Sequence, residues 1–215
     1  MDIEEKRREL EQLRTQVREL EDELHAAEAE RRYVPPLYYG AYYATTGFLL
    51  GIFGAAASLL VNIIGAPIVG KSPLELIRIY LTFPLGEKAL QLSDPAHHVF
   101  AISDGTILAI GCCLYLGTGM VLGVPFYVAL TWWAGRASLV ERFITATVLS
   151  LVLWAISFYG ILSWLQPALF GGNWIVSGEY LPWWVAAGTH LVFGWTLAAL
   201  YPLGQYTPYS SPVEQ

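Results

Sequence analysis

The side chain with the clearest capacity for chemistry is His190, near the middle of 181–203, a stretch without Lys, Arg, Asp or Glu. An imidazole inside a membrane can ligate heme b, contact a quinone, or form a hydrogen bond to a neighbouring helix. His97 and His98 lie in a polar loop, several helical turns from His190 along the chain, so a pair of heme ligands is not built from them. We take a structural hydrogen bond as the first interpretation, with heme or quinone contact as alternatives.

No other residues have the spacing of a catalytic or metal site. Cys112 and Cys113 are adjacent in an apolar stretch, which favours packing over a disulfide or metal ligation. Asp104 stands where an apolar stretch begins and is expected to act as a helix cap near the positive end of the helix dipole. The sequence shows no nucleophile elbow, metal triad or phosphate loop, so we expect no enzyme activity beyond that of a subunit in an enzyme complex, no metal and no nucleic-acid partner.

Four apolar stretches must position these residues, and each is long enough to cross a hydrocarbon layer of about 30 Å at about 1.5 Å per residue. Tyrosine and tryptophan occur near their ends, as at a membrane interface. The fold class predicted is all-α: an integral membrane protein with four transmembrane helices, an N-terminal coiled-coil-like helix and a short interfacial helix. The membrane domain covers 33–204, a tail follows at 205–215, and the spans are expected at about 41–64, 103–131, 139–166 and 181–203.

A shorter helix is predicted at about 72–83, between the first two spans. Ser72 to Glu75 matches a capping box, and Pro84 sets the expected end. Leu74, Ile77, Leu81 and Leu85 form one apolar stripe, whereas Glu75, Arg78 and Thr82 lie off it. About a dozen residues cannot span a bilayer, so the pattern predicts a helix in the plane of the interface.

Small residues recur at intervals of four in the apolar stretches and predict close contacts between helices, because small side chains let helix backbones approach. Within this set Asn62 is expected to hydrogen-bond another helix. A faint repeat at an offset of 77 residues would give Gly117 and Gly194 equivalent positions. The predicted packing residues are Gly47, Gly51, Gly54, Ser58, Asn62, Gly117, Gly119, Gly123 and Gly194.

The N-terminal arm, residues 1–32, carries 18 of the 30 charged side chains of the chain. Apolar residues repeat through it in heptads and form a seam, which is Ile3, Leu10, Leu13, Val17, Leu20 and Leu24. A single amphipathic helix of this kind is marginal in water and needs a partner. We expect a partner helix, either from a second copy of the chain or from another subunit; a lone helix on the protein's own surface is the alternative.

The run Thr189 to Gly194, together with Tyr201, resembles a pattern in small multi-pass bacterial membrane proteins of uncharacterised function, some of which accompany respiratory complexes of the heme–copper oxidase type. The segment SPLELIR at 72–78 is similar to them too, whereas the N-terminal arm departs from them. The resemblance implies an accessory role and transfers no catalytic residue.

The function expected is therefore a non-catalytic accessory or structural subunit of a multi-subunit membrane complex, in a respiratory electron-transfer assembly. Its partners would be other integral membrane subunits, a helix for the arm, and lipid. One alternative is a redox subunit in which His190 contacts heme b or a quinone, and a second is a homo-oligomeric channel or membrane scaffold.

Basic residues suggest an orientation in a bacterial inner membrane. Five basic residues lie near span ends on the side of both termini, and three lie on the opposite side, which favours cytoplasmic termini. The two sets are Arg18, Arg31, Arg32, Arg136 and Arg142 against Lys71, Arg78 and Lys88.

Overall fold

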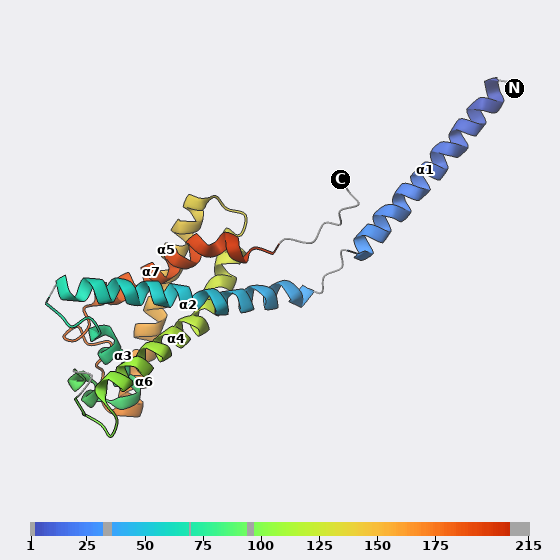
Figure 1. Ribbon diagram of the computed structural model, residues 1–215. Helices are drawn as coiled ribbons and strands as arrows, with labels where there is room; N and C mark the ends of the chain where they lie inside the picture. The colour runs from blue at the N-terminus through green and yellow to red at the C-terminus, as the bar shows by residue number, and fades with distance from the viewer. Residues whose placement is uncertain (1–2, 32–35, 69, 94–96, 207–215) are drawn as a thin grey trace. The chain divides into compact units, whose positions relative to one another are not determined.

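The computed structural model describes residues 3–31, 36–68, 70–93 and 97–206 of the chain. It divides into two compact units, 1–39 and 40–215, which are described separately below. Every regular element among the described residues is helical (Figure 1). The predicted tail from residue 207 onwards and the predicted boundary at 32–35 lie outside the described residues.

Four helices are long and apolar enough to cross a membrane, which confirms the all-α membrane fold predicted from the sequence. The second and fourth spans begin within two residues of their expected starts. The spans are built from α2 (Pro36–Ile68), α4 (Asp104–Ala134), a composite third span described next, and α7 (Trp183–Leu200) with its 3-10 extension η3 (Tyr201–Gly204).

The third span is one helical run in three segments, α5 (Leu139–Ala155), the π-helix η2 (Ile156–Leu162) and α6 (Ser163–Phe170). It continues past Pro167, where the sequence predicts an end, and stops at Gly171, whose φ of 76° only glycine adopts easily. The N–H of Gly171 donates to the carbonyl of Pro167 at 3.0 Å. A glycine in the left-handed conformation is thus the terminator of this helix.

Glycines set the contact between α2 and α4. Gly47 lies against Gly123, and Gly51 against Gly119, so the two helices run antiparallel with their backbones in contact. A Cβ on Gly51 would lie 2.9 Å from the Cα of Met120. No side chain fits between two backbones at this distance, which makes these four positions specific for glycine.

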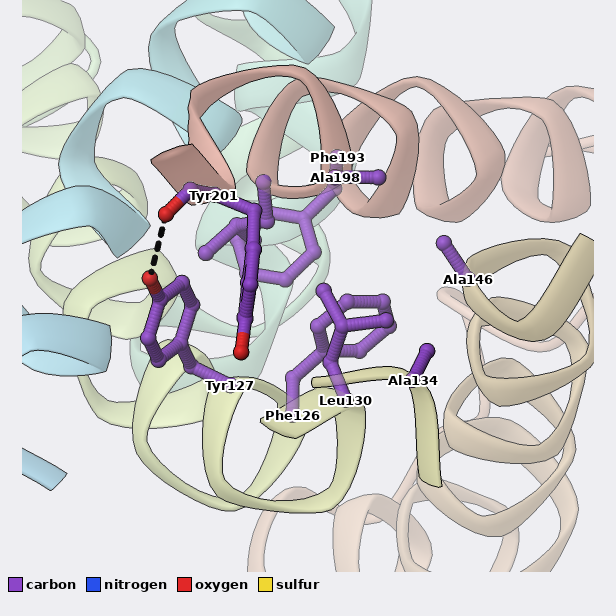
Figure 2. Close-up of a cluster of buried hydrophobic side chains, with 9 residues drawn as sticks. Phe126, Tyr127, Leu130, Ala134, Ala146, Phe193, Ala198 and Tyr201 are labelled. Carbon is purple, nitrogen blue, oxygen red and sulfur yellow. Dashed lines mark hydrogen bonds between the residues drawn. The ribbon is translucent and has the colours of Figure 1, made fainter. Parts of the chain in front are cut away.

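The ends of α4 and α7 enclose an aromatic cluster (Figure 2). Tyr127 and Tyr201 are almost fully buried, with ring centroids 5.4 Å apart, and the Tyr127 hydroxyl donates to the backbone carbonyl of Tyr201 at 3.1 Å. Arg142, from the start of α5, places its guanidinium 4.3 Å from the centroid of the Tyr201 ring. This cation–π contact joins α5 to the same cluster.

The helix between the first two spans differs from its prediction. α3 (Glu75–Leu85) begins three residues later than expected, and its N-cap, Leu74, makes no side-chain capping bond. Ile77 and Leu81 pack towards α4, while Ile79 belongs to a separate cluster with residues of η2 and α7. A sequence stripe marks only one buried face, whereas α3 is buried on two.

Thr82 shows this most clearly, because it was expected off the apolar stripe and is 0% exposed. It accepts a hydrogen bond at 3.0 Å from the side-chain amide of Gln166 in α6, also 0% exposed. The Gln166 carbonyl oxygen accepts from the N–H of Ile175, again at 3.0 Å. One buried glutamine therefore ties together α3, α6 and the loop before α7.

Replacing Gln166 with leucine is expected to lower the free energy of unfolding by about 2 kcal/mol, since the N–H of Ile175 would stay buried without an acceptor. Thermal unfolding in detergent micelles measures this. The matched control is Gln91→Leu, at an exposed glutamine of the 3-10 helix η1 (Glu87–Gln91), which should leave the midpoint unchanged. Equal midpoints for the two variants would contradict the role given to Gln166.

In the N-terminal unit, α1 (Ile3–Arg31) is one continuous helix. The five described seam side chains are all exposed, by 49% to 61%, and they are Leu10, Leu13, Val17, Leu20 and Leu24. The side chain of Ile3 lies outside the described residues. The heptad seam is thus solvent-accessible in the single chain.

Candidate functional site

A cavity of about 360 Å³ lies at the level where the four spans have their midpoints. Its walls come from every span and from α3, and they are almost entirely apolar. Polar groups enter it at a few positions only, which are Ser58, Tyr80, Tyr115, Thr118, Ser157, Thr189 and His190. Pockets that bind small molecules have this volume and this sparse set of polar groups.

His190 contributes its ring to the cavity wall. Its Nδ1 lies 2.8 Å from the carbonyl oxygen of Ala186, one turn earlier on α7. A carbonyl can only accept, so Nδ1 carries a proton, and in the neutral imidazole Nε2 then keeps its lone pair. The ring also meets Phe158 edge to face, with centroids 5.8 Å apart. His190 is therefore held as an acceptor within the membrane domain.

The expected bond between Asn62 and another helix is present. Its amide donates to the hydroxyl of Thr189 on α7 at 3.1 Å and to the carbonyl of Ser58 at 2.8 Å. Ser58 is itself buried and forms a 2.9 Å bond with the hydroxyl of Tyr115 on α4. These two polar contacts hold α2 against α4 and α7 at the edge of the cavity.

The remaining predicted packing residues divide into two groups. A Cβ on Gly54 would lie 2.7 Å from the Phe193 ring, so this glycine makes room for an aromatic ring. A Cβ on Gly194 would first meet the Ser150 hydroxyl of α5 and then the Phe126 ring at 2.7 Å, so this glycine lets α7 approach α5 closely. Gly117 differs, because a Cβ there would meet no atom within 4 Å. The proposed repeat pairs Gly117 with Gly194, yet only Gly194 takes part in packing within the described chain.

His97 forms a hydrogen bond outside the cavity, at the start of α4. Its Nδ1 lies 2.7 Å from the carboxylate of Asp104, the first residue of α4, and this carboxylate also accepts from the N–H groups of Ser93 and Val99. Asp104 therefore organises the preceding loop, and Ser103 occupies the N-cap position expected for it. Tyr115, the first α4 residue at the cavity, is about 16 Å further along the helix at about 1.5 Å per residue. His97 is thus no second ligand for a heme at His190.

A second cavity of about 450 Å³ lies beside the first, among the ends of α2, α3 and α7. Lys71 and Glu75 line it, together with apolar residues and Gly65 and Gly188. The two cavities share Thr189 as a wall residue. The second cavity holds no histidine, so the candidate site remains the one at His190.

Sequence reasoning found His190, Ser58 and Asn62 but not the other groups at the cavity. Tyr115 and Thr118 stand mid-span on α4, and hydroxyl residues inside a predicted span are a weak signal that could have marked them. The π-helix supplies Ser157 and Phe158, and no residue pattern announces it. Tyr80 belongs to α3, which was placed at the interface rather than in the core.

The fold and the cavity define the class: an all-α membrane protein with a partly open cavity lined by its four spans and by α3. No family model matches the chain, and neither a curated protein nor a solved structure matches it significantly.

Proposed function

We propose that the protein is a non-catalytic accessory subunit of a multi-subunit membrane complex. The observation that carries the proposal is the seam of α1, whose five described apolar residues are 49% to 61% exposed. A heptad seam is stabilised by burial against another helix, and each buried leucine contributes about 1.5–3 kcal/mol. The seam therefore supports docking to a helix of a partner subunit.

The membrane domain would contribute a second contact surface. The third span is the least enclosed of the four, with 11% of its apolar window buried, and large apolar side chains of α5 such as Val140, Ile144 and Val148 are exposed. Lipid covers such a surface, and so does the span of another subunit. The third span is therefore the one we propose for contact with other integral membrane subunits.

The respiratory assignment, the bacterial inner membrane and the cytoplasmic termini are parts of the same proposal. They rest on the resemblance of 189–194 and 72–78 to bacterial proteins that accompany heme–copper oxidases, and on the distribution of basic residues. Arg136 is exposed between α4 and α5, whereas Arg142 is buried against Tyr201 and carries less weight in that distribution. Four crossings would bring both termini to the same face of the membrane.

The test is purification from native membranes in a mild detergent, with mass spectrometry of the co-eluting proteins and a visible spectrum. In the double variant Leu13→Gln/Leu20→Gln, the amount of co-eluting partner should fall at least about tenfold, because two leucines that the partner helix would bury are removed from the seam. The matched control Thr15→Gln/Asp22→Gln places the same residues on the opposite face of α1 and should retain the partner.

Three results would decide the matter. Seam-dependent co-elution with an integral membrane subunit and a heme spectrum supports the respiratory proposal in full. Seam-dependent assembly of this chain alone, without colour, replaces it with the homo-oligomeric channel or scaffold. A monomer that elutes alone, and does not respond to the seam variant, overturns both.

The cavity at His190 favours a second candidate function, the redox subunit that contacts a cofactor. The Nδ1–H bond to Ala186 leaves Nε2 in the state that ligates a metal. A singly ligated heme b at this histidine would give a Soret band that His190→Ala abolishes while seam-dependent partners remain, but a cavity of about 360 Å³ suits a single ring better than a porphyrin. Quinone contact is treated below, since it depends on donors and acceptors.

A further inference from the structure

The cavity at His190 is widened by an irregular helix. Four of the seven residues of η2 line it: Ser157, Phe158, Ile161 and Leu162. A π-helix has more residues per turn than an α-helix, and such segments are frequent at functional sites. Side chains stabilise this one, since Trp164 Nε1 donates to the carbonyl of Gly160 at 2.7 Å, and Ser163 donates to that of Tyr159 at 2.7 Å. The span is therefore distorted where it faces the cavity.

The hydroxyls of Ser58 and Tyr115, the first pair in the cavity, both donate their protons within the protein. The Ser58 hydroxyl donates to the carbonyl of Ala55 at 2.9 Å. Because a hydroxyl has one proton, Tyr115 must be the donor in its 2.9 Å bond with Ser58. Both protons are thus committed within the protein, and the Tyr115 oxygen keeps acceptor capacity.

The second pair follows the same order. Either Thr118 donates to the carbonyl of Leu114 at 3.0 Å and Tyr80 donates to Thr118 at 2.6 Å, or Thr118 donates to Tyr80 and Tyr80 donates to the Leu114 carbonyl at 3.4 Å. In both arrangements the two hydroxyl protons are donated within the protein. The Thr189 hydroxyl donates to the carbonyl of Val185 at 2.8 Å. Ser157 is the one hydroxyl of the cavity without a hydrogen bond inside the described part of the chain, and it can donate or accept.

His190 is the remaining polar group of the cavity. Its only proton is on Nδ1 and is donated to Ala186, so Nε2, on the far side of the ring from its own helix, can only accept. The polar groups of the cavity are therefore mainly acceptors: Nε2 and the oxygens of Tyr80 and Tyr115. A ligand that brings a hydroxyl proton satisfies them, whereas a ligand with carbonyl groups alone finds one donor, at Ser157.

We propose that this cavity binds a lipid-soluble alcohol or phenol whose hydroxyl donates to Nε2 of His190. An apolar cavity of about 150 Å³ holds benzene, so 360 Å³ takes one ring with a short chain. Among quinone-type molecules the site selects the hydroquinone over the oxidised quinone. The site is formed by the membrane unit alone, so it does not depend on the partner proposed for α1.

The experiment compares two probes, 4-pentylphenol and its methyl ether 4-pentylanisole, in which the hydroxyl proton of the first is replaced by a methyl group in the second. Dissociation constants are measured by ligand-observed NMR with the purified full-length protein in micelles. The phenol is expected to bind about five to ten times more tightly, the effect of one net hydrogen bond. The ratio should fall to about one in His190→Leu and persist in His98→Leu, which changes an exposed loop histidine.

A second measurement uses the wild-type chain and so does not depend on whether His190→Leu folds. With histidines labelled by ¹⁵N, saturating phenol should move one unprotonated imidazole nitrogen upfield, and the ether should not. Ser157→Phe, which fills part of the cavity, should weaken the binding of both probes. Equal affinities in the wild type, no binding of either probe, or a preference that survives in His190→Leu would each overturn the proposal.

Discussion

Replacing Gly51 with leucine is expected to prevent α2 and α4 from packing and to abolish the folded, monodisperse protein. A Cβ at this position would lie 2.9 Å from the Cα of Met120 and 3.0 Å from the backbone carbon of Gly119. Overpacking in an adaptable core costs about 1–3 kcal/mol, and here the obstacle is backbone, which cannot change rotamer. We therefore expect a loss beyond 3 kcal/mol, measured by size-exclusion chromatography and thermal unfolding in detergent.

The control is Gly117→Leu on the facing helix, where a Cβ has no neighbour within 4 Å. Its unfolding midpoint should equal that of the wild type. Gly51→Ala should fall between the two, because one methyl group already meets the α4 backbone. A Gly51→Leu variant as stable as Gly117→Leu would show that α2 and α4 do not cross at these glycines.

The same pair of variants separates folding from assembly. The open space beside Gly117 is available to another subunit, so Gly117→Leu is expected to leave the isolated protein intact and would weaken co-purification if a partner packs there. That outcome would assign to Gly117 the packing role expected from the sequence, but towards a partner instead of towards the chain's own helices.

The four spans follow from the sequence because length and hydropathy are properties of each segment alone. The glycine contact was also indicated, since Gly47 and Gly51 have the spacing that close backbone approach requires. The spacing does not show which helix these glycines will contact. Gly117 is an example: it is a glycine of α4 like Gly119, but it lies on a face of the helix that does not contact α2.

The second buried face of α3 was missed for a different reason. Its stripe of Ile77 and Leu81 was read as the whole buried surface, and Thr82 as part of the exposed one. Burial of Thr82 depends on Gln166, which is 84 residues away in the sequence. A polar pair of this kind satisfies itself, and neither member alone signals burial.

The cavity was only partly predictable for the same reason. His190 was identifiable because an ionisable group within a span is rare. Its state as an acceptor depends on the bond to Ala186, and the cavity depends on the π-helix across from it. Both are results of helix geometry at atomic scale, which hydrophobic periodicity does not encode.

Asp104→Ala is expected to lower the free energy of unfolding by about 2–3 kcal/mol. The carboxylate is 0% exposed and accepts hydrogen bonds from the N–H groups of Val99 and Ser93, at 2.9 and 3.2 Å, and from His97 at 2.7 Å. Alanine leaves the partly buried N–H of Val99 without this acceptor and opens a space beside the start of α4, whereas the exposed Ser93 and His97 can bond to water. Thermal or denaturant unfolding in micelles measures the loss.

Two further variants make the role of the carboxylate specific. Asp104→Asn keeps the side-chain volume but replaces one acceptor oxygen with an NH₂ group, which then faces another donor. Its loss of unfolding free energy should therefore be intermediate. His97→Ala removes one donor whose side chain is 54% exposed and should cost about 1 kcal/mol or less. Glu141→Ala, which breaks the exposed capping box with Ser138, sets the scale of an ordinary cap at about 1 kcal/mol.

The order of these losses distinguishes two roles for Asp104. If the carboxylate acted only through the dipole of α4, asparagine and alanine would both cost about as much as Glu141→Ala, because a dipole contact contributes about 0.3–1 kcal/mol. If it organises the loop, alanine exceeds asparagine, and asparagine exceeds His97→Ala. The described loop residues 97–103 lead directly into α4, which carries both Gly119 at the helix crossing and Tyr115 at the cavity. A loss at Asp104 should therefore also weaken 4-pentylphenol binding, although this residue does not touch the site.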